Sequence, residues 1–150
     1  MKKTIAFLLS LYTLLLFSSC DQEVQVDENL AGMWSYIDEA HVKGLGGGKI
    51  YFSAEGYATM YTGQDSTGGK SFNIDGVNCQ LIYSTNTDVI PNQIDFIVKE
   101  IDSGKTLREI LCIYEFIENG KLKINLNSDI SPNRPIDFSD TKSIGILEKK

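Results

Sequence analysis

The sequence predicts an all-β fold, an antiparallel up-and-down barrel of eight or nine strands with a short helical turn before the first strand. Short runs of alternating apolar and polar residues fill residues 32–148, and turn-forming residues separate them. No window of twelve or more residues shows the 3.6-residue periodicity of a long helix. A chain of 150 residues suffices for one small closed barrel, and closure removes the exposed edges of an open sheet.

The first twenty residues predict a targeting signal. Lys2 and Lys3 give a charged start, residues 5–17 are mostly apolar, and Ser18-Ser19 places small side chains directly before Cys20. The apolar run is shorter than the roughly 20 residues that cross a bilayer. The pattern is typical of a bacterial lipoprotein signal over residues 1–19, with Cys20 as the lipidated residue.

Residues 20–29 are predicted to form a flexible acidic spacer between this anchor and the domain, which covers residues 30–150. Diacylation of Cys20 would hold the protein on a membrane. We therefore expect a location in the cell envelope, on the periplasmic or surface face of the outer membrane.

Nine segments of the remaining chain have the pattern of strands. The segment around Trp34 comes first, and a helical turn is predicted just before it, at residues 27–31. Turn signals at residues 54–56 and at Glu118-Asn119-Gly120 predict hairpins, the second with type I′ geometry. The predicted strands are 32–38, 48–53, 57–62, 71–75, 79–84, 93–100, 108–116, 121–127 and 143–148.

Composition and motifs exclude several classes of function. The chain has 14 Lys and Arg against 20 Asp and Glu, a net charge of −6, which argues against a nucleic-acid partner. His41, the one histidine, lies in a polar segment, and no metal-binding or nucleophile motif accompanies it. The glycine-rich stretches 44–48 and 63–71 precede strands, not the helix that phosphate binding needs, and are predicted to be mobile loops. We expect no enzyme activity, metal or cofactor.

Two cysteines other than Cys20 leave two alternatives open. Cys79 and Cys112 form an even pair in a compartment that can be oxidising, so they are candidates for a disulfide. Alternatively, both are buried free thiols that pack as small apolar side chains.

Five motifs in order resemble a family of lipocalin-like domains. Gly32-Met33-Trp34 resembles the G-x-W that opens the first strand of lipocalins and other calycins. Residues 91–96, 113–116, 121–124 and 134–138 resemble the P-x-x-I-D, I-Y-E, L-K and R-P-x-x-F motifs of an uncharacterised lipocalin-like family first described from Planctomycetes. The resemblance implies a calycin-like barrel with Trp34 at the closed end and Arg134 covering its ring.

These observations support two hypotheses about function. The first is a lipid-anchored lipoprotein that binds a small apolar ligand inside its barrel. The second is a protein-binding envelope module, such as an inhibitor of an envelope hydrolase, with a barrel filled by its own side chains. Tyrosine offers an apolar face and a hydroxyl, so aromatic residues are candidates for the pocket wall. These candidates are Trp34, Tyr51, Tyr57, Tyr61 and Tyr83.

Overall fold

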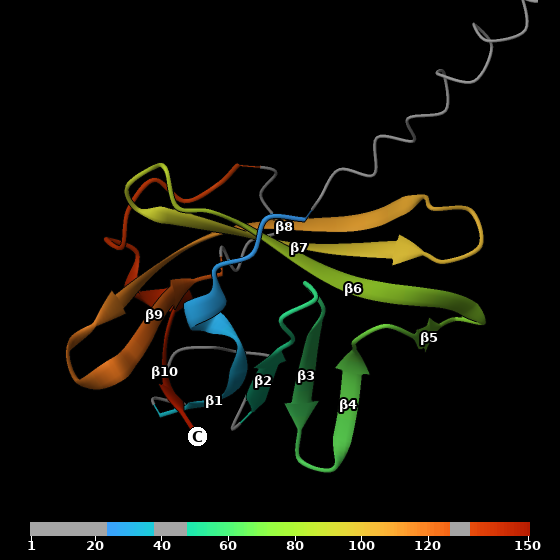
Figure 1. The fold of residues 1–150 in the computed structure, drawn as a ribbon, viewed down its shortest axis with the longest axis horizontal. Coiled ribbons are helices and arrows are strands. Elements are labelled where there is room, and N and C mark those ends of the chain that lie inside the picture. Colours follow the sequence, from blue (N-terminus) through green and yellow to red (C-terminus); the bar gives the residue numbers. More distant parts are fainter. Residues whose placement is uncertain (1–23, 38–47, 127–132) are drawn as a thin grey trace, which may run out of the picture.

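The computed structural model describes residues 24–37, 48–126 and 133–150 (Figure 1). The predicted signal, Cys20, His41 and most of the first glycine-rich stretch lie outside these residues. None of the helices within the described ranges has the length and hydrophobicity needed to cross a bilayer.

The described chain forms ten antiparallel strands and three short 3₁₀ helices. The N-terminal part contains η1 (Glu28–Leu30), β1 (Gly32–Tyr36), β2 (Lys49–Phe52), β3 (Ala58–Thr62), β4 (Asp65–Gly68) and β5 (Phe72–Ile74). The C-terminal part contains β6 (Val77–Asn86), β7 (Asn92–Glu100), β8 (Thr106–Ile117), η2 (Glu118–Gly120), β9 (Lys121–Asn125), η3 (Thr141–Ser143) and β10 (Ile144–Lys149). The sheet order is β4-β3-β2-β1-β10-β9-β8-β7-β6-β5, so the chain meanders and its last strand pairs with its first.

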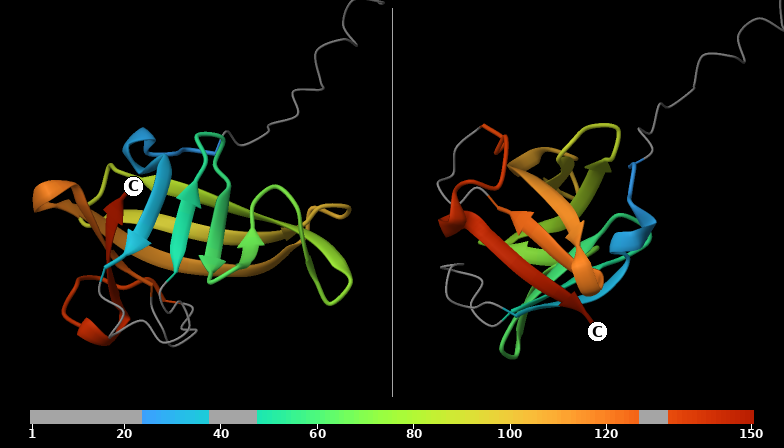
Figure 2. Two further views of the ribbon diagram at one scale, coloured as in Figure 1. Left: turned by 90° about the horizontal axis from the view of Figure 1, so that it is seen from below. Right: turned by 90° about the vertical axis from the view of Figure 1, so that its left-hand side faces the viewer.

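The sheet curls into a nearly closed barrel, which confirms the predicted architecture and is consistent with a lipocalin-like barrel. The short strands β1–β4 lie on one side and the long strands β6–β8 on the other (Figure 2). Two backbone hydrogen bonds join the sides at a seam: Tyr83 N–H donates to Gly56 O (2.8 Å) and Leu81 N–H to Gly69 O (2.9 Å). An isolated bridge between Tyr57 and Ile82 adds to the seam.

The strand register separates an inner face from an outer face, because directly paired residues of antiparallel strands lie on the same side of the sheet. Trp34 pairs with Ile50, and Phe52 pairs with Ala58; all four are buried, so they mark the inner face. The Phe52 ring lies 4.9 Å from the Tyr83 ring and 6.1 Å from the Phe96 ring, centroid to centroid. Since Phe52 comes from β2 and the other two rings from β6 and β7, these contacts fill the interior from side to side.

One end of the barrel is covered by residues 24–31. The carboxylate of Asp27 caps η1 by accepting from Asn29 N–H, and η1 occupies the predicted helical turn. The Gln25 carbonyl accepts from Thr85 N–H (2.8 Å), and the Tyr114 hydroxyl donates to Asp27 (2.7 Å). Residues 24–29 therefore pack against the barrel, although the sequence assigned them to a flexible spacer.

The described residues form ten strands, more than the eight or nine predicted. Strand β4 lies within residues 63–71, which the sequence predicted to be a loop. Its residues are Asp-Ser-Thr-Gly, mostly exposed, and they pair only with β3 at the end of the sheet order. Such a polar edge strand carries no alternating apolar signal. At the second predicted hairpin, Asn119 (φ 63°) and Gly120 (φ 69°) both have the positive φ that a type I′ turn requires.

The disulfide alternative for the two cysteines is wrong: Cys79 and Cys112 are buried free thiols. Their partners on the shared neighbour strand β7 are Glu100 and Ile94, which are six residues apart. Six residues of strand span roughly 20 Å, whereas a disulfide needs Cα atoms within about 7 Å of each other.

We expect the protein to lose stability at alkaline pH. Burial raises the pKa of Cys112 and of Tyr83 to about 12, from ordinary values of 9.0 and 10.0. Burial also raises the pKa values of Tyr36 and Tyr114. The unfolded chain releases these protons first, so their stabilisation is complete below pH 9 and is lost as the pH rises towards 12. Each group contributes a loss of about 1.4 kcal/mol per pH unit in its window.

Urea unfolding between pH 8 and pH 11 measures this loss. The substitution Cys112→Val should remove the part of the decline that begins near pH 9 and leave the part that begins near pH 10. A free energy of unfolding that stays constant over this range would contradict the expectation.

Candidate functional site

The two halves of the barrel interior differ in how completely their side chains are buried. Near η1, the inward-facing rings of Trp34, Tyr83 and Tyr114 are buried, whereas Phe116, whose ring lies beside Trp34 and Tyr114, is 40% exposed. Towards the opposite end, inward-facing side chains on β1, β3, β7, β8 and following β9 remain partly exposed although they contact the core. We call these residues the inner wall; they are Tyr36, Met60, Val98, Ile110 and Leu126.

The inner wall draws on both sides of the barrel, on β1 and β3 from the short strands and on β7 and β8 from the long ones (Figure 2). Its side chains come from five positions around the barrel. Four of them are apolar, and the fifth, Tyr36, carries a hydroxyl. Apolar side chains at such a position offer surface that an apolar ligand would cover. The inner wall is therefore the candidate functional site.

Tyr36 supplies the polar group of the inner wall. Its ring lies against Gly145, where a Cβ would come within 2.6 Å of Tyr36 Cε1. Burial, followed by the proximity of the Cys112 thiol, raises its pKa above the ordinary value, so the hydroxyl remains protonated at neutral pH. It can therefore donate a hydrogen bond to a bound molecule.

The five aromatic residues predicted to line a pocket do not do so together. Trp34 and Tyr83 face inward, but they are buried in the packed half near η1. Tyr51, Tyr57 and Tyr61 face outward, so their assignment to an interior wall is wrong. The register shows why: Tyr51 pairs with Thr59 and alternates with the inward-facing Ile50 and Phe52.

Arg134 does not cover Trp34, contrary to what the resemblance implied. Its guanidinium donates to both carboxylate oxygens of Asp95 (2.5 and 2.9 Å) and to the carbonyl of Cys112 (2.7 Å). Asp95 alternates with the inward-facing Ile94 and Phe96, so this ion pair lies on the outer face. Lys149 takes the expected role: its Nζ lies 5.5 Å from the centre of the Trp34 ring.

The ion pair of Arg134 and Asp95 should stabilise the fold measurably, since both side chains are less than a quarter exposed. We expect Arg134→Ala to lower the free energy of unfolding by about 2 kcal/mol, because it leaves a partly buried carboxylate unpaired. Arg134→Lys should recover less than half of this loss, because an ammonium cannot make the same paired hydrogen bonds to both carboxylate oxygens of Asp95. Chemical denaturation measures both, and a cost of Arg134→Ala below about 0.5 kcal/mol would contradict the expectation.

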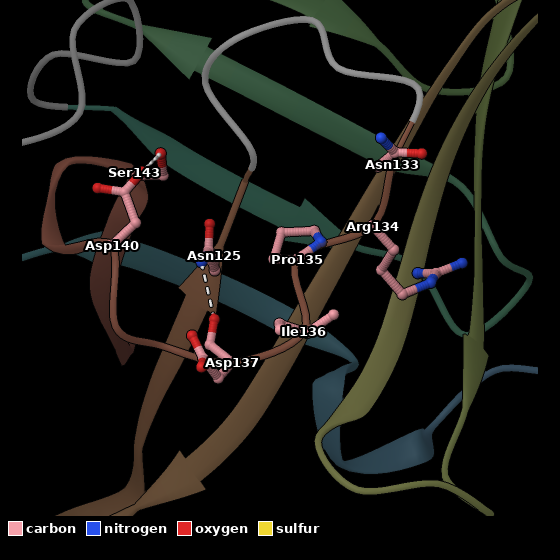
Figure 3. Close-up of a pocket in the computed structure, with 8 residues that line it drawn as sticks. All are labelled: Asn125, Asn133, Arg134, Pro135, Ile136, Asp137, Asp140 and Ser143. Carbon is pink, nitrogen blue, oxygen red and sulfur yellow. Dashed lines mark hydrogen bonds between the residues drawn. The ribbon is translucent and has the colours of Figure 1, made fainter.

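A hollow of about 280 Å³ lies on the outer face beside the segment that carries Arg134 (Figure 3). Several of its polar groups are hydrogen-bonded. Asn125 Nδ2 donates to the Asp137 carbonyl (3.1 Å), and the Asp137 carboxylate accepts from the backbone and side chain of Ser139. These bonds lower the pKa of Asp137. The carboxylate of Asp95 therefore serves an ion pair, and that of Asp137 serves a turn.

A second outer hollow, of about 420 Å³, lies over β2 and β3. Tyr51 and Tyr57 line it together with Glu55 and Lys70, which form an ion pair. This pairing raises the pKa of Lys70. Lys70 Nζ also lies 5.5 Å from the centre of the Tyr57 ring. Tyr61 does not line this hollow.

The inner-wall residues were not among the predicted site residues, although part of the signal was present. Tyr36 follows Trp34 by two positions and must share its face, and Val98 follows Phe96 by two positions and must share its face. The alternation shows which face of the sheet a side chain occupies, but not whether it lies near η1 or near the opposite end of the barrel. That position depends on where η1 packs.

Among the described residues, no group of three or more His, Cys, Asp and Glu side chains is placed to hold a metal ion. Comparison with known proteins gives no match: no family model, curated protein or solved structure matches this chain.

Proposed function

We propose that this protein is a lipid-anchored lipoprotein of the cell envelope that binds a small, largely apolar molecule against the inner wall of its barrel. The observation that carries the proposal is the partial exposure of five inward-facing side chains, four of them apolar, at the end of the barrel away from η1. Transfer of such surface from water to a ligand contributes roughly 25 cal/mol per Å².

The single hydroxyl at the site sets the chemistry of the ligand. Tyr36 offers one hydrogen-bond donor within an otherwise apolar wall. A ligand with an apolar body and one acceptor, such as a carbonyl or ether oxygen, would satisfy this donor and bury the rest of its surface. A charged ligand would lose its hydration without a counter-charge on this wall.

The anchor and the location rest on the sequence. The charged start, the apolar run and the small residues before Cys20 support lipidation there. In this proposal the protein sits on the outer membrane, on its periplasmic or surface face, and binds its ligand without catalysis. The motif resemblance supports placement in the lipocalin-like family named above.

A protein-binding module is the second candidate function. The burial of the Trp34, Tyr83 and Tyr114 rings near η1 favours it, as do two strongly exposed apolar side chains, Ile90 at 99% exposure and Ile136 at 86%. Exposed apolar side chains of this kind are common at sites of protein contact, but single ones are also ordinary surface residues.

An apolar fluorescent probe, N-phenyl-1-naphthylamine, tests the proposal on the full chain in mild detergent. The fluorescence of the probe in the same detergent without protein is the background. Met60→Trp places a large ring on the inner wall, whereas Tyr61→Trp makes a similar change at the next residue of β3, on the outer face. We expect Met60→Trp to weaken probe binding at least tenfold and Tyr61→Trp to change it less than twofold.

Equal probe binding by the two variants, or no saturable binding by the unmodified protein, would contradict the proposal. Urea unfolding of both variants checks that Met60→Trp remains folded. If it does not, Val98→Phe and its outward neighbour Ile97→Phe on β7 repeat the comparison with a smaller ring.

A further inference from the structure

The outer hollow over β2 and β3 has the composition of a ligand site that the proposed function does not use. Tyr51 is 40% exposed, and Tyr57 is half-buried beside it. The hydroxyl residues Ser53 and Thr59 and the ion pair of Glu55 and Lys70 complete its lining. The hollow therefore combines two aromatic rings with donors and acceptors of hydrogen bonds.

The backbone beneath this hollow is held firmly. Ser53 N–H donates to the Tyr57 carbonyl (2.8 Å), and Ser53 Oγ accepts from Tyr57 N–H (3.0 Å). The Tyr83 hydroxyl donates to the Ser53 carbonyl (2.7 Å), which ties the turn to the core. The site is thus built on a fixed hairpin, so a ligand would meet groups that are already in place.

Gly69 keeps one side of the hollow open. A Cβ at this position would lie 3.0 Å from Thr59 Oγ1, and the φ of Gly69 is +79°. Its carbonyl also accepts the seam hydrogen bond from Leu81 N–H. A side chain here would therefore crowd the Thr59 hydroxyl that faces the hollow.

The charges at the hollow narrow the class of ligand. Glu55 and Lys70 neutralise each other, and both are more than 60% exposed, so the rim offers an acceptor and a donor without net charge. An ionic ligand would have to compete with this pair. A purely apolar ligand would leave the carboxylate and the ammonium unused. A neutral polyhydroxylated ring fits both features, because its C–H face packs on an aromatic ring while its hydroxyls donate and accept hydrogen bonds.

We propose that the outer hollow formed by Tyr51, Tyr57, Glu55 and Lys70 is a binding site for a neutral saccharide. Tyr51 provides the exposed ring on which the sugar packs. Glu55 and Lys70 bind the sugar hydroxyls at the rim. This site is separate from the inner wall, since it lies on the opposite face of the same strands.

Saturation-transfer NMR of the full chain in detergent tests the proposal with three neutral hexasaccharides: cellohexaose, maltohexaose and chitohexaose. We expect at least one of them to receive saturation on the C–H protons of one sugar face. Tyr51→Ala should weaken its binding at least tenfold, and Tyr51→Phe should retain most of it because the ring remains. Tyr61→Ala is the matched control, an outward-facing tyrosine outside the hollow, and should change binding less than twofold.

Two results would overturn the proposal. One is the absence of binding by all three neutral saccharides, whether or not the anionic hexagalacturonate binds. The other is binding that Tyr51→Ala and Tyr61→Ala weaken equally. Circular dichroism of each variant excludes loss of fold as the cause, and Glu55→Gln provides a second variant at the exposed rim if Tyr51→Ala unfolds.

Discussion

Replacing Trp34 with alanine should lower the free energy of unfolding by about 4 kcal/mol, the range expected when a buried Trp or Phe is truncated. Trp34 is 2% exposed, and its indole N–H donates to the Leu30 carbonyl at 2.7 Å. Its ring also packs near Phe116, at 6.2 Å between centroids, and beneath Lys149 Nζ. The substitution would remove apolar contacts and would also leave the Leu30 carbonyl without the indole donor.

Two further variants separate these contributions. Trp34→Phe keeps much of the apolar contact and loses the hydrogen bond, so it should cost roughly 1 to 2 kcal/mol. Tyr51→Ala removes an outward-facing aromatic side chain from the neighbouring strand and should cost less than about 1 kcal/mol. Urea unfolding followed by circular dichroism measures all three. A cost of Trp34→Ala no greater than that of Tyr51→Ala would show that Trp34 does not hold the covered end of the barrel.

Gly68→Ala should destabilise the protein by about 3 kcal/mol or more. Gly68 has a φ of +107°, and a Cβ there would lie 2.5 Å from the Ala58 carbonyl oxygen and 2.8 Å from Leu81 Cδ2. The positive φ alone costs roughly 1 to 2 kcal/mol for a residue with a side chain. The Ala58 carbonyl cannot move away freely, because it is backbone and accepts a hydrogen bond from Gly69 N–H. The side chain would therefore push the two sides of the seam apart.

Gly63→Ala is the matched control for this effect. Gly63 also has a positive φ, +62°, but a Cβ there would meet no atom within 4 Å. Its replacement should cost only the backbone strain, about 1 kcal/mol. The difference between the two free energies of unfolding isolates the close approach at the seam. Equal costs would mean that the seam adapts to a methyl group.

The barrel could be predicted because its strands alternate clearly. Ile94, Phe96 and Val98 stand at every second position of the predicted strand 93–100, which predicts that they share one face, and in the structure all three face inward. Strand β4 was missed for the opposite reason, because Asp65 to Gly68 presents no apolar face. The pattern thus predicts strands that bury side chains and fails for an edge strand held by backbone bonds alone.

The candidate site was harder to predict. The alternation of Ile50 and Phe52 with Tyr51 already indicates that Tyr51 faces outward. Arg134 has no such signal, because its partner Asp95 is 39 positions away in the sequence. Long-range ion pairs and the level of each side chain along the barrel depend on tertiary packing, which periodicity does not record.

Native mass spectrometry of the full chain, purified from its own cell envelope in mild detergent, tests the central claim most directly. We predict a stoichiometric adduct of a few hundred daltons that is lost in Met60→Trp and retained in Tyr61→Trp. A bare protein mass, or an adduct that both variants retain equally, would contradict binding at the inner wall. A bare mass with a co-purifying envelope protein would instead favour the protein-binding function.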